Sequence, residues 1–130
     1  MLGCGTVGTG VLRILRDTAE LLETRLGRPL AVTAIAVRDS SAERDEVVPT
    51  DLLTTDPESI VSHPDVDVVL ELMGGVERAS ELVLQALASG KQVVTANKAM
   101  LASDGERLFR QAESSGRDLL FEAAVGAGCR

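Results

Sequence analysis

A glycine-rich turn at the start of the chain is the group of residues best suited to chemistry. Gly3, Gly5 and Gly8 satisfy the pattern Gly-x-Gly-x-x-Gly, and apolar residues recur at helical spacing directly after it. In such a turn the first glycine permits the tight bend, the second lets backbone approach a pyrophosphate, and the third packs the helix against a sheet. The helix N-terminus adds free N–H donors. The turn favours dinucleotide binding, and a purely structural turn is the alternative.

A charged pair follows the next aliphatic run. Arg38 and Asp39 come directly after residues 30–37, which are almost entirely aliphatic. A guanidinium at the end of this strand pairs bidentately with the 2′-phosphate of NADP, whereas a carboxylate there holds the ribose hydroxyls of NAD. Arg38 therefore favours NADP, and Asp39 would oppose it if it pointed inward. The simpler interpretation is that Arg38 and Asp39 are solvated charges on a loop and bind no ligand.

Polar residues also follow the later strands. Lys98 comes just after a short apolar run, where an ammonium could bind a carboxylate substrate or relay a proton during hydride transfer. Glu122 follows the last strand and is either a buried acid, a cation ligand or an ordinary strand-end carboxylate. Glu71 lies within a predicted strand and needs a partner near the sheet, so we interpret it as structural. The alternative interpretation of Lys98 is a solvent-exposed lysine at the start of a helix.

Strands and helices are predicted to alternate along the whole chain. Met1 and Leu2 are too short to form the strand expected before the glycine turn. Alternation of this kind predicts an α/β fold, a Rossmann-like doubly wound parallel sheet, here one domain over residues 1–130 and truncated at both ends. The predicted helices cover 7–26, 58–62, 77–89 and 104–114, and the predicted strands cover 30–37, 66–73, 91–96 and 118–121.

Composition excludes several other functions. The chain has 130 residues, with 13 Lys and Arg against 20 Asp and Glu, so its formal net charge is −7 and it would repel nucleic acids and anionic membranes. Phe109 and Phe121 are the only aromatic residues, so stacking platforms are excluded. One histidine (His63) and two distant cysteines (Cys4 and Cys129) leave no zinc-site spacing and room for one disulfide at most. With no signal or membrane-spanning segment, we expect a cytoplasmic protein.

Several longer segments resemble the homoserine dehydrogenases in their nucleotide-binding domain. The matching segments are 3–11, 36–39, 66–75, 90–99 and 121–128, and with the helices between them they cover nearly the whole chain. The stretches Thr-Ala-Asn-Lys-Ala and Phe-Glu-Ala-Ala-Val-Gly-Ala-Gly are far more specific than a generic glycine fingerprint. The resemblance implies NAD(P)-dependent hydride transfer between L-homoserine and L-aspartate 4-semialdehyde, in the biosynthesis of threonine, isoleucine and methionine.

The resemblance also assigns roles to individual residues. The glycine turn with Thr6 and Val7 would hold the pyrophosphate, and Arg38 would take the 2′-phosphate of NADP. Gly74, Thr95 and Lys98 would flank the nicotinamide end, with Lys98 as a catalytic residue. The family's sodium site matches the Glu122 carboxylate and the backbone oxygens of Val125, Ala127 and Cys129.

Two departures from the family lead to further expectations. The family has a full strand before the glycine turn, and after the Phe-Glu-Ala-x-Val-Gly-x-Gly stretch it continues into a substrate and dimerisation domain; both are missing here. We therefore expect a fragment, marginally stable and catalytically silent alone, whose parent is a homodimer or homotetramer acting on a small molecule. A sugar-dehydrogenase-like oxidoreductase is one alternative, although that family has Glu-Lys-Pro where this chain has Ala96-Asn97-Lys98-Ala99. A non-catalytic NAD(P)-binding module is the other.

Overall fold

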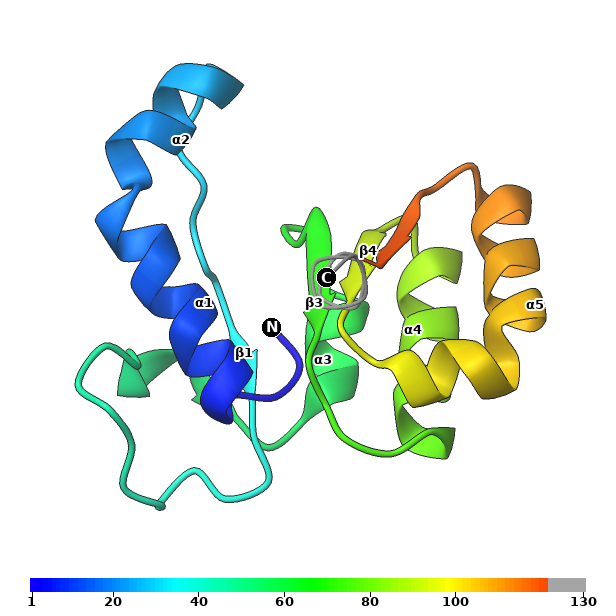
Figure 1. Ribbon diagram of the computed structural model, residues 1–130, viewed down its shortest axis with the longest axis horizontal. Helices are drawn as coiled ribbons and strands as arrows, with labels where there is room; N and C mark the ends of the chain where they lie inside the picture. Colours follow the sequence, from blue (N-terminus) through cyan, green and yellow to red (C-terminus); the bar gives the residue numbers. More distant parts are fainter. Residues whose placement is uncertain (122–130) are drawn as a thin grey trace, which may run out of the picture.

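Parallel strands and helices alternate along the chain, as the sequence predicts (Figure 1). The computed structural model describes residues 1–121. No helix within these residues is both long and apolar enough to cross a membrane. The elements are α1 (Thr6–Asp17), α2 (Ala19–Leu26), β1 (Ile35–Ala36), η1 (Thr50–Leu52), β2 (Leu53–Thr54), α3 (Pro57–Val61), β3 (Val68–Glu71), α4 (Glu77–Ala88), β4 (Gln92–Thr95), α5 (Lys98–Ser115) and β5 (Leu119–Phe121).

All strand pairs are parallel, and Leu2 joins them into one layer. Strands β3, β4 and β5 pair in that order, and β1 pairs with β2. Leu2 lies between the two groups, forming parallel bridges to Ala36 and to Glu71. Its N–H donates to Leu70 O at 2.8 Å, and its carbonyl accepts from Leu72 N at 2.8 Å. Met1 and Leu2 form no strand of their own, as the sequence predicts, but Leu2 occupies the central position of the layer through these bridges.

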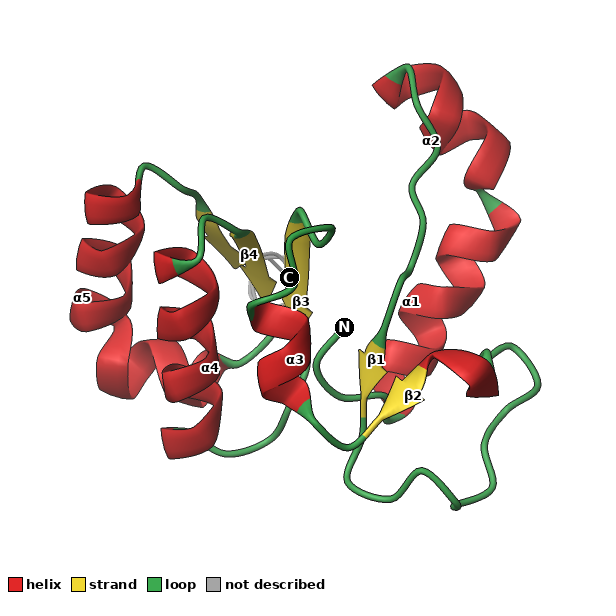
Figure 2. Ribbon diagram, turned by 180° about the vertical axis from the view of Figure 1, so that it is seen from behind, coloured by secondary structure: helices red, strands yellow, loops and turns green. Residues whose placement is uncertain are grey.

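Apolar side chains alternate between the two faces of this layer. Leu2, Val69 and Val93 belong to a large cluster with buried residues of α3, α4 and α5. Met1, Leu12 and other residues of the opposite face form a smaller cluster. Successive residues of a strand point to opposite faces of the sheet, so each face has its own apolar cluster. Helices α3, α4 and α5 cover one face and α1 covers the other, which makes the sheet doubly wound. Helices α3, α4 and α5 lie side by side, whereas α1 and α2 form an arm that stands apart from them (Figure 2).

The helix predicted for residues 7–26 is in fact two helices, and α5 begins earlier than predicted. Thr18 ends α1 and begins α2, and its hydroxyl donates back to Ile14 O at 2.6 Å, a bond that competes with regular helix geometry. Helix α5 starts at Lys98 rather than near 104 because the Asn97 side chain caps it, accepting from Met100 N at 3.0 Å.

The predicted strand 30–37 is almost entirely unpaired. Only Ile35 and Ala36 form β1, and Leu30 is 52% exposed. The backbone of β1 is bonded to Met1 and Gly3 on one side and to β2 on the other, and β2 lies in a segment for which no strand is predicted. A strand extends only as far as its neighbours reach, so hydrophobicity alone overestimated it. The short helix predicted for 58–62 is confirmed as α3.

Candidate functional site

A cleft of about 740 Å³ opens where the carboxyl ends of β1 and β3 meet the glycine turn. Ligands of open parallel sheets bind at this edge, where the connections leave the strands in opposite directions. The cleft is lined by Gly3, Cys4, Gly5, Ala36, Val37, Arg38, Arg44, Thr55, Pro57, Leu72, Met73, Gly74 and Arg78.

The three glycines of the turn have different surroundings. A Cβ on Gly3, whose φ is +92°, would lie 3.0 Å from the carbonyl oxygen of Leu72, so a side chain is excluded by both conformation and space. A Cβ on Gly8 would meet Met1 Cε at 3.0 Å and Gly3 O at 3.1 Å. At Gly5 a Cβ would have nothing within 4 Å. Gly3 and Gly8 thus permit close packing, whereas Gly5 leaves the backbone open to a ligand.

The N-terminus of α1 is available to an anion. Gly5 is the N-cap residue, and no side chain of the described residues accepts a hydrogen bond from the first turn. The free N–H groups and the helix dipole favour negative charge there. A second cavity of about 550 Å³ adjoins this helix end, and Cys4 and Arg44 line both cavities.

Three guanidinium groups surround the part of the cleft near β1, and they differ in what they bind. Arg78 pairs with Glu58 and, at 3.5 Å, with Glu81. Arg44 donates from Nη2 to the carbonyl oxygen of Asp39 at 2.9 Å, but its Nε is buried without a partner among the described residues. Arg38 is exposed at the end of β1. Arg38 is therefore exposed to the cleft, Arg44 keeps one buried donor without a partner among the described residues, and Arg78 is occupied.

Asp39 is not among the residues that line this cleft. Its carboxylate accepts hydrogen bonds from the backbone N–H of Ser41 at 2.9 Å and from the Ser41 hydroxyl at 2.6 Å. These bonds stabilise the charged form and lower the pKa of Asp39. The carboxylate is thus held within its own loop.

A buried polar network lies at the other end of the cleft, beneath the loop after β3. Glu71 is fully buried, and its carboxylate accepts from the Thr95 hydroxyl and, at 2.9 Å, from Met73 N. Burial raises the pKa of Glu71, although both hydrogen bonds favour its charged form. Asn97 N–H donates to Thr95 Oγ1 at 2.9 Å, and Asn97 Nδ2 donates to Gly75 O at 2.7 Å.

The structure brings together some of the residues predicted from the sequence and separates others. Gly3, Gly5, Arg38 and Gly74 line the cleft, and Thr6 lines the second cavity. Four other predicted residues line neither cavity. Val7 is exposed on α1, and Gly8 is buried beneath the turn. Thr95 is 1% exposed and its hydroxyl is already hydrogen-bonded, whereas Lys98 is exposed as the first residue of α5. The predicted sodium ligands Glu122, Val125, Ala127 and Cys129 lie outside the described residues.

Sequence reasoning missed Arg44 and understated Asn97. Arg44 lies in a polar loop without periodicity, and only the fold brings it to the cleft. The sequence did indicate a role for Asn97, since asparagine directly before a helix is a favoured N-cap residue. Glu71, interpreted as structural, has the expected polar partners.

The parallel sheet, the glycine turn before a helix and the cleft at the strand ends define a dinucleotide-binding domain of the Rossmann type. The family model described as "Homoserine dehydrogenase, NAD binding domain" matches residues 3–122, and the chain belongs to this family. This membership decides against the sugar-dehydrogenase-like alternative.

Relatives and solved structures agree with this assignment. Homoserine dehydrogenase of Corynebacterium glutamicum is 48% identical over 125 residues, which are 96% of this chain and 28% of that protein. A crystal structure of homoserine dehydrogenase from Thiobacillus denitrificans matches with a TM-score of 0.86 at 47% identity, over 95% of this chain and 28% of that one. One from S. aureus matches with a TM-score of 0.88 at 36% identity, over 94% of this chain and 31% of that one. The chain thus spans less than a third of the length of these relatives.

Proposed function

We propose that this chain is the cofactor-binding part of an enzyme that interconverts L-homoserine and L-aspartate 4-semialdehyde with NADP. The observation that carries the proposal is the cleft, which lies between an uncapped helix N-terminus and two arginines, the exposed Arg38 and Arg44, whose Nε has no partner among the described residues. The relatives are named homoserine dehydrogenase, which supports the choice of substrate. The chain spans only part of the length of these relatives. We further propose that residues outside this chain complete the active site, and that the enzyme is cytoplasmic and forms a homodimer or homotetramer.

The residues present fit a phosphorylated dinucleotide. The space above Gly5 would let a pyrophosphate approach the N–H groups of Thr6 and Val7. Arg38 and Arg44 would hold the 2′-phosphate, since a guanidinium forms two parallel hydrogen bonds to phosphate oxygens. The bound dinucleotide supplies the hydride donor or acceptor. Lys98 would hold the substrate or relay the proton of its hydroxyl from the start of α5.

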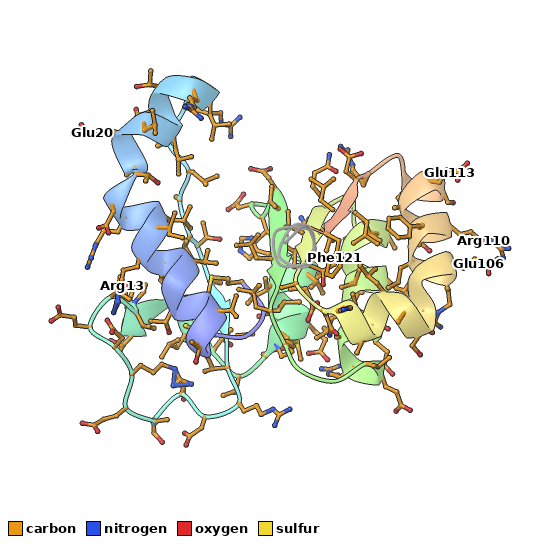
Figure 3. All side chains as sticks on the ribbon, viewed as in Figure 1. Arg13, Glu20, Glu106, Arg110, Glu113 and Phe121 are labelled. Carbon is orange, nitrogen blue, oxygen red and sulfur yellow. The ribbon has the colours of Figure 1, made fainter. Side chains whose placement is uncertain are left out.

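Calorimetric titration of the chain with NADP⁺ and with NAD⁺ tests this proposal. We expect NADP⁺ to bind more tightly, because a charge-assisted pair contributes about 1.5–3 kcal/mol, equivalent to a factor of about 10–150 in affinity. Arg38→Ala and Arg44→Ala should each weaken NADP⁺ binding by about tenfold or more and change NAD⁺ binding little. Arg110→Ala, on the outward face of α5, is the matched control (Figure 3). Equal affinity for both dinucleotides, unchanged in the two cleft variants, would contradict the NADP assignment.

A further inference from the structure

The loop of residues 73–75 is held from below by buried side chains. Glu71 Oε2 accepts from Met73 N at 2.9 Å. Asn97 Nδ2 donates to Met73 O at 3.3 Å and to Gly75 O at 2.7 Å. Met73 and Gly74 line the cleft, so the position of this loop sets the shape of one of its walls.

The same network reaches the start of α5. The Thr95 hydroxyl donates to Glu71 and accepts from Asn97 N at 2.9 Å, which connects the ends of β3 and β4. Asn97 Oδ1 in turn accepts from Met100 N at 3.0 Å and caps the helix. Lys98 is the residue after this cap. One set of hydrogen bonds therefore couples the cleft wall to the Lys98 backbone.

Packing alone does not require a carboxyl group at position 71. On the same face of the sheet, Val69 and Val93 are fully buried within the apolar cluster. A buried acid loses its hydration, which is costly unless hydrogen bonds compensate, and an apolar residue of similar volume is often neutral or stabilising in its place. Both hydrogen bonds of Glu71 instead serve the loop and the hydroxyl of Thr95.

We propose that Glu71 is a positioning residue that sets the nicotinamide end of the cleft, holding the loop 73–75 directly and the start of α5 through Thr95 and Asn97. This inference rests on the proposed function, because it assigns the nicotinamide half of the dinucleotide to the wall formed by Met73 and Gly74. The adenosine half lies at the opposite end, near Arg38. Glu71 therefore affects one half of the ligand and leaves the other unchanged.

Two ligands separate the halves in a titration of the chain. NADP⁺ carries both halves, whereas adenosine 2′,5′-bisphosphate carries only the phosphorylated adenosine. For Glu71→Leu we expect the dissociation constant of NADP⁺ to rise about fivefold or more, as for the loss of one ordering hydrogen bond. The constant for the bisphosphate should change less than about twofold. Glu71→Gln keeps one acceptor for Met73 N and should restore part of the NADP⁺ affinity.

A second measurement does not depend on any ligand. Amide hydrogen exchange at Met73, followed by NMR, should accelerate in Glu71→Leu and less in Glu71→Gln, because the bond to Oε2 protects this amide. Thr95→Val removes the hydroxyl donor while keeping the side-chain shape, and it should reproduce the loss of NADP⁺ affinity if Glu71→Leu does not fold. Glu113→Gln is the matched control, since Glu113 is exposed on the outward face of α5 (Figure 3).

The outcomes are distinct for the two proposals. Equal weakening of both ligands, or unchanged Met73 exchange in the Glu71 variants, would overturn the positioning role while leaving cofactor binding intact. A wild-type chain that binds NADP⁺ no more tightly than the bisphosphate would overturn it as well, because nothing would then hold the nicotinamide half. A folded wild-type chain that binds neither ligand would overturn the proposed function itself.

Discussion

The two halves of the molecule are held together in different ways. The half built from α3, α4, α5 and strands β3 to β5 shares a large apolar cluster, in which Leu82, Val83, Met100 and Leu108 are fully buried. Among the described residues, the half built from α1, α2, β1 and β2 packs around a smaller cluster, whose buried members are Met1, Leu12, Ile35 and Val48 and which also contacts Leu70 and Leu72 of the other half. Val7 and Ile14 on α1 are 55% and 62% exposed.

This difference separates the two ends of the cleft. Residues that would bind phosphate come from the sparsely packed half, and the network around Glu71 belongs to the densely packed one. The two halves meet at Leu2, whose backbone bridges β1 and β3. A ligand that contacts both ends of the cleft would therefore stabilise the sparsely packed half, because a ligand that binds the folded state and not the unfolded state raises the free energy of unfolding.

The largest expected effect comes from truncating matched aliphatic residues in the two halves. Leu82→Ala on α4 should lower the free energy of unfolding by about 2–5 kcal/mol, because a buried leucine leaves a cavity. Ile14→Ala on α1 should change it by less than about 0.5 kcal/mol, because the side chain is mostly in water. Urea titration followed by far-UV circular dichroism measures both, since the chain lacks Trp and Tyr. Equal losses would show that α1 is packed as tightly as α4.

Substitutions at the N-caps of α5 and α1 should change the free energy of unfolding in opposite directions. Asn97→Ala removes the cap of α5 and should cost about 1 kcal/mol of stability. Gly5→Ser gives α1 a side-chain cap and should add only a few tenths of a kcal/mol, roughly, since glycine is already tolerated there. The new hydroxyl would also compete for the N–H groups offered to phosphate, so NADP⁺ affinity should fall. Urea titration and calorimetry measure the two effects, and unchanged NADP⁺ affinity in Gly5→Ser would contradict the anion site.

The smallest effect is a pH dependence, and it should have opposite sign in the two halves. Burial raises the pKa of Glu71 above its ordinary value of 4.5. The stabilisation from this group is therefore complete below pH 4.5 and is lost as the pH rises through the raised pKa. Glu71→Gln should therefore gain stability relative to wild type as the pH rises from 4.5. Hydrogen bonds from Ser41 lower the pKa of Asp39 below 3.8, so its stabilisation is present above 3.8 and is lost in acid.

Asp39→Asn accordingly should be less stable than wild type at neutral pH and match it once Asp39 of the wild type is protonated. Urea midpoints measured across the pH range for both variants give the two slopes. Slopes of the same sign would show that Glu71 is not protected from water as the structure indicates.

Local patterns predicted most elements of the densely packed half. Strands β3, β4 and β5 and helix α4 lie within the predicted ranges or one residue from them, because their hydrophobic periodicity is strong and Gly90 and Gly116 mark turns. Predictions failed where pairing partners are distant in sequence. The strand 30–37 was overestimated and β2 was missed, because each depends on backbone contacts with a neighbour that hydropathy does not encode.

The order of the elements and the glycine turn follow from the sequence, because they depend on local periodicity and on backbone freedom at single residues. The family also follows from it, through long stretches of matching residues. The fold itself places Arg38 and Arg44 on the same cleft and joins Glu71, Thr95 and Asn97 in one hydrogen-bond network. These groups come from separate loops and strand ends, and only chain packing sets the hydrogen-bond distances between them.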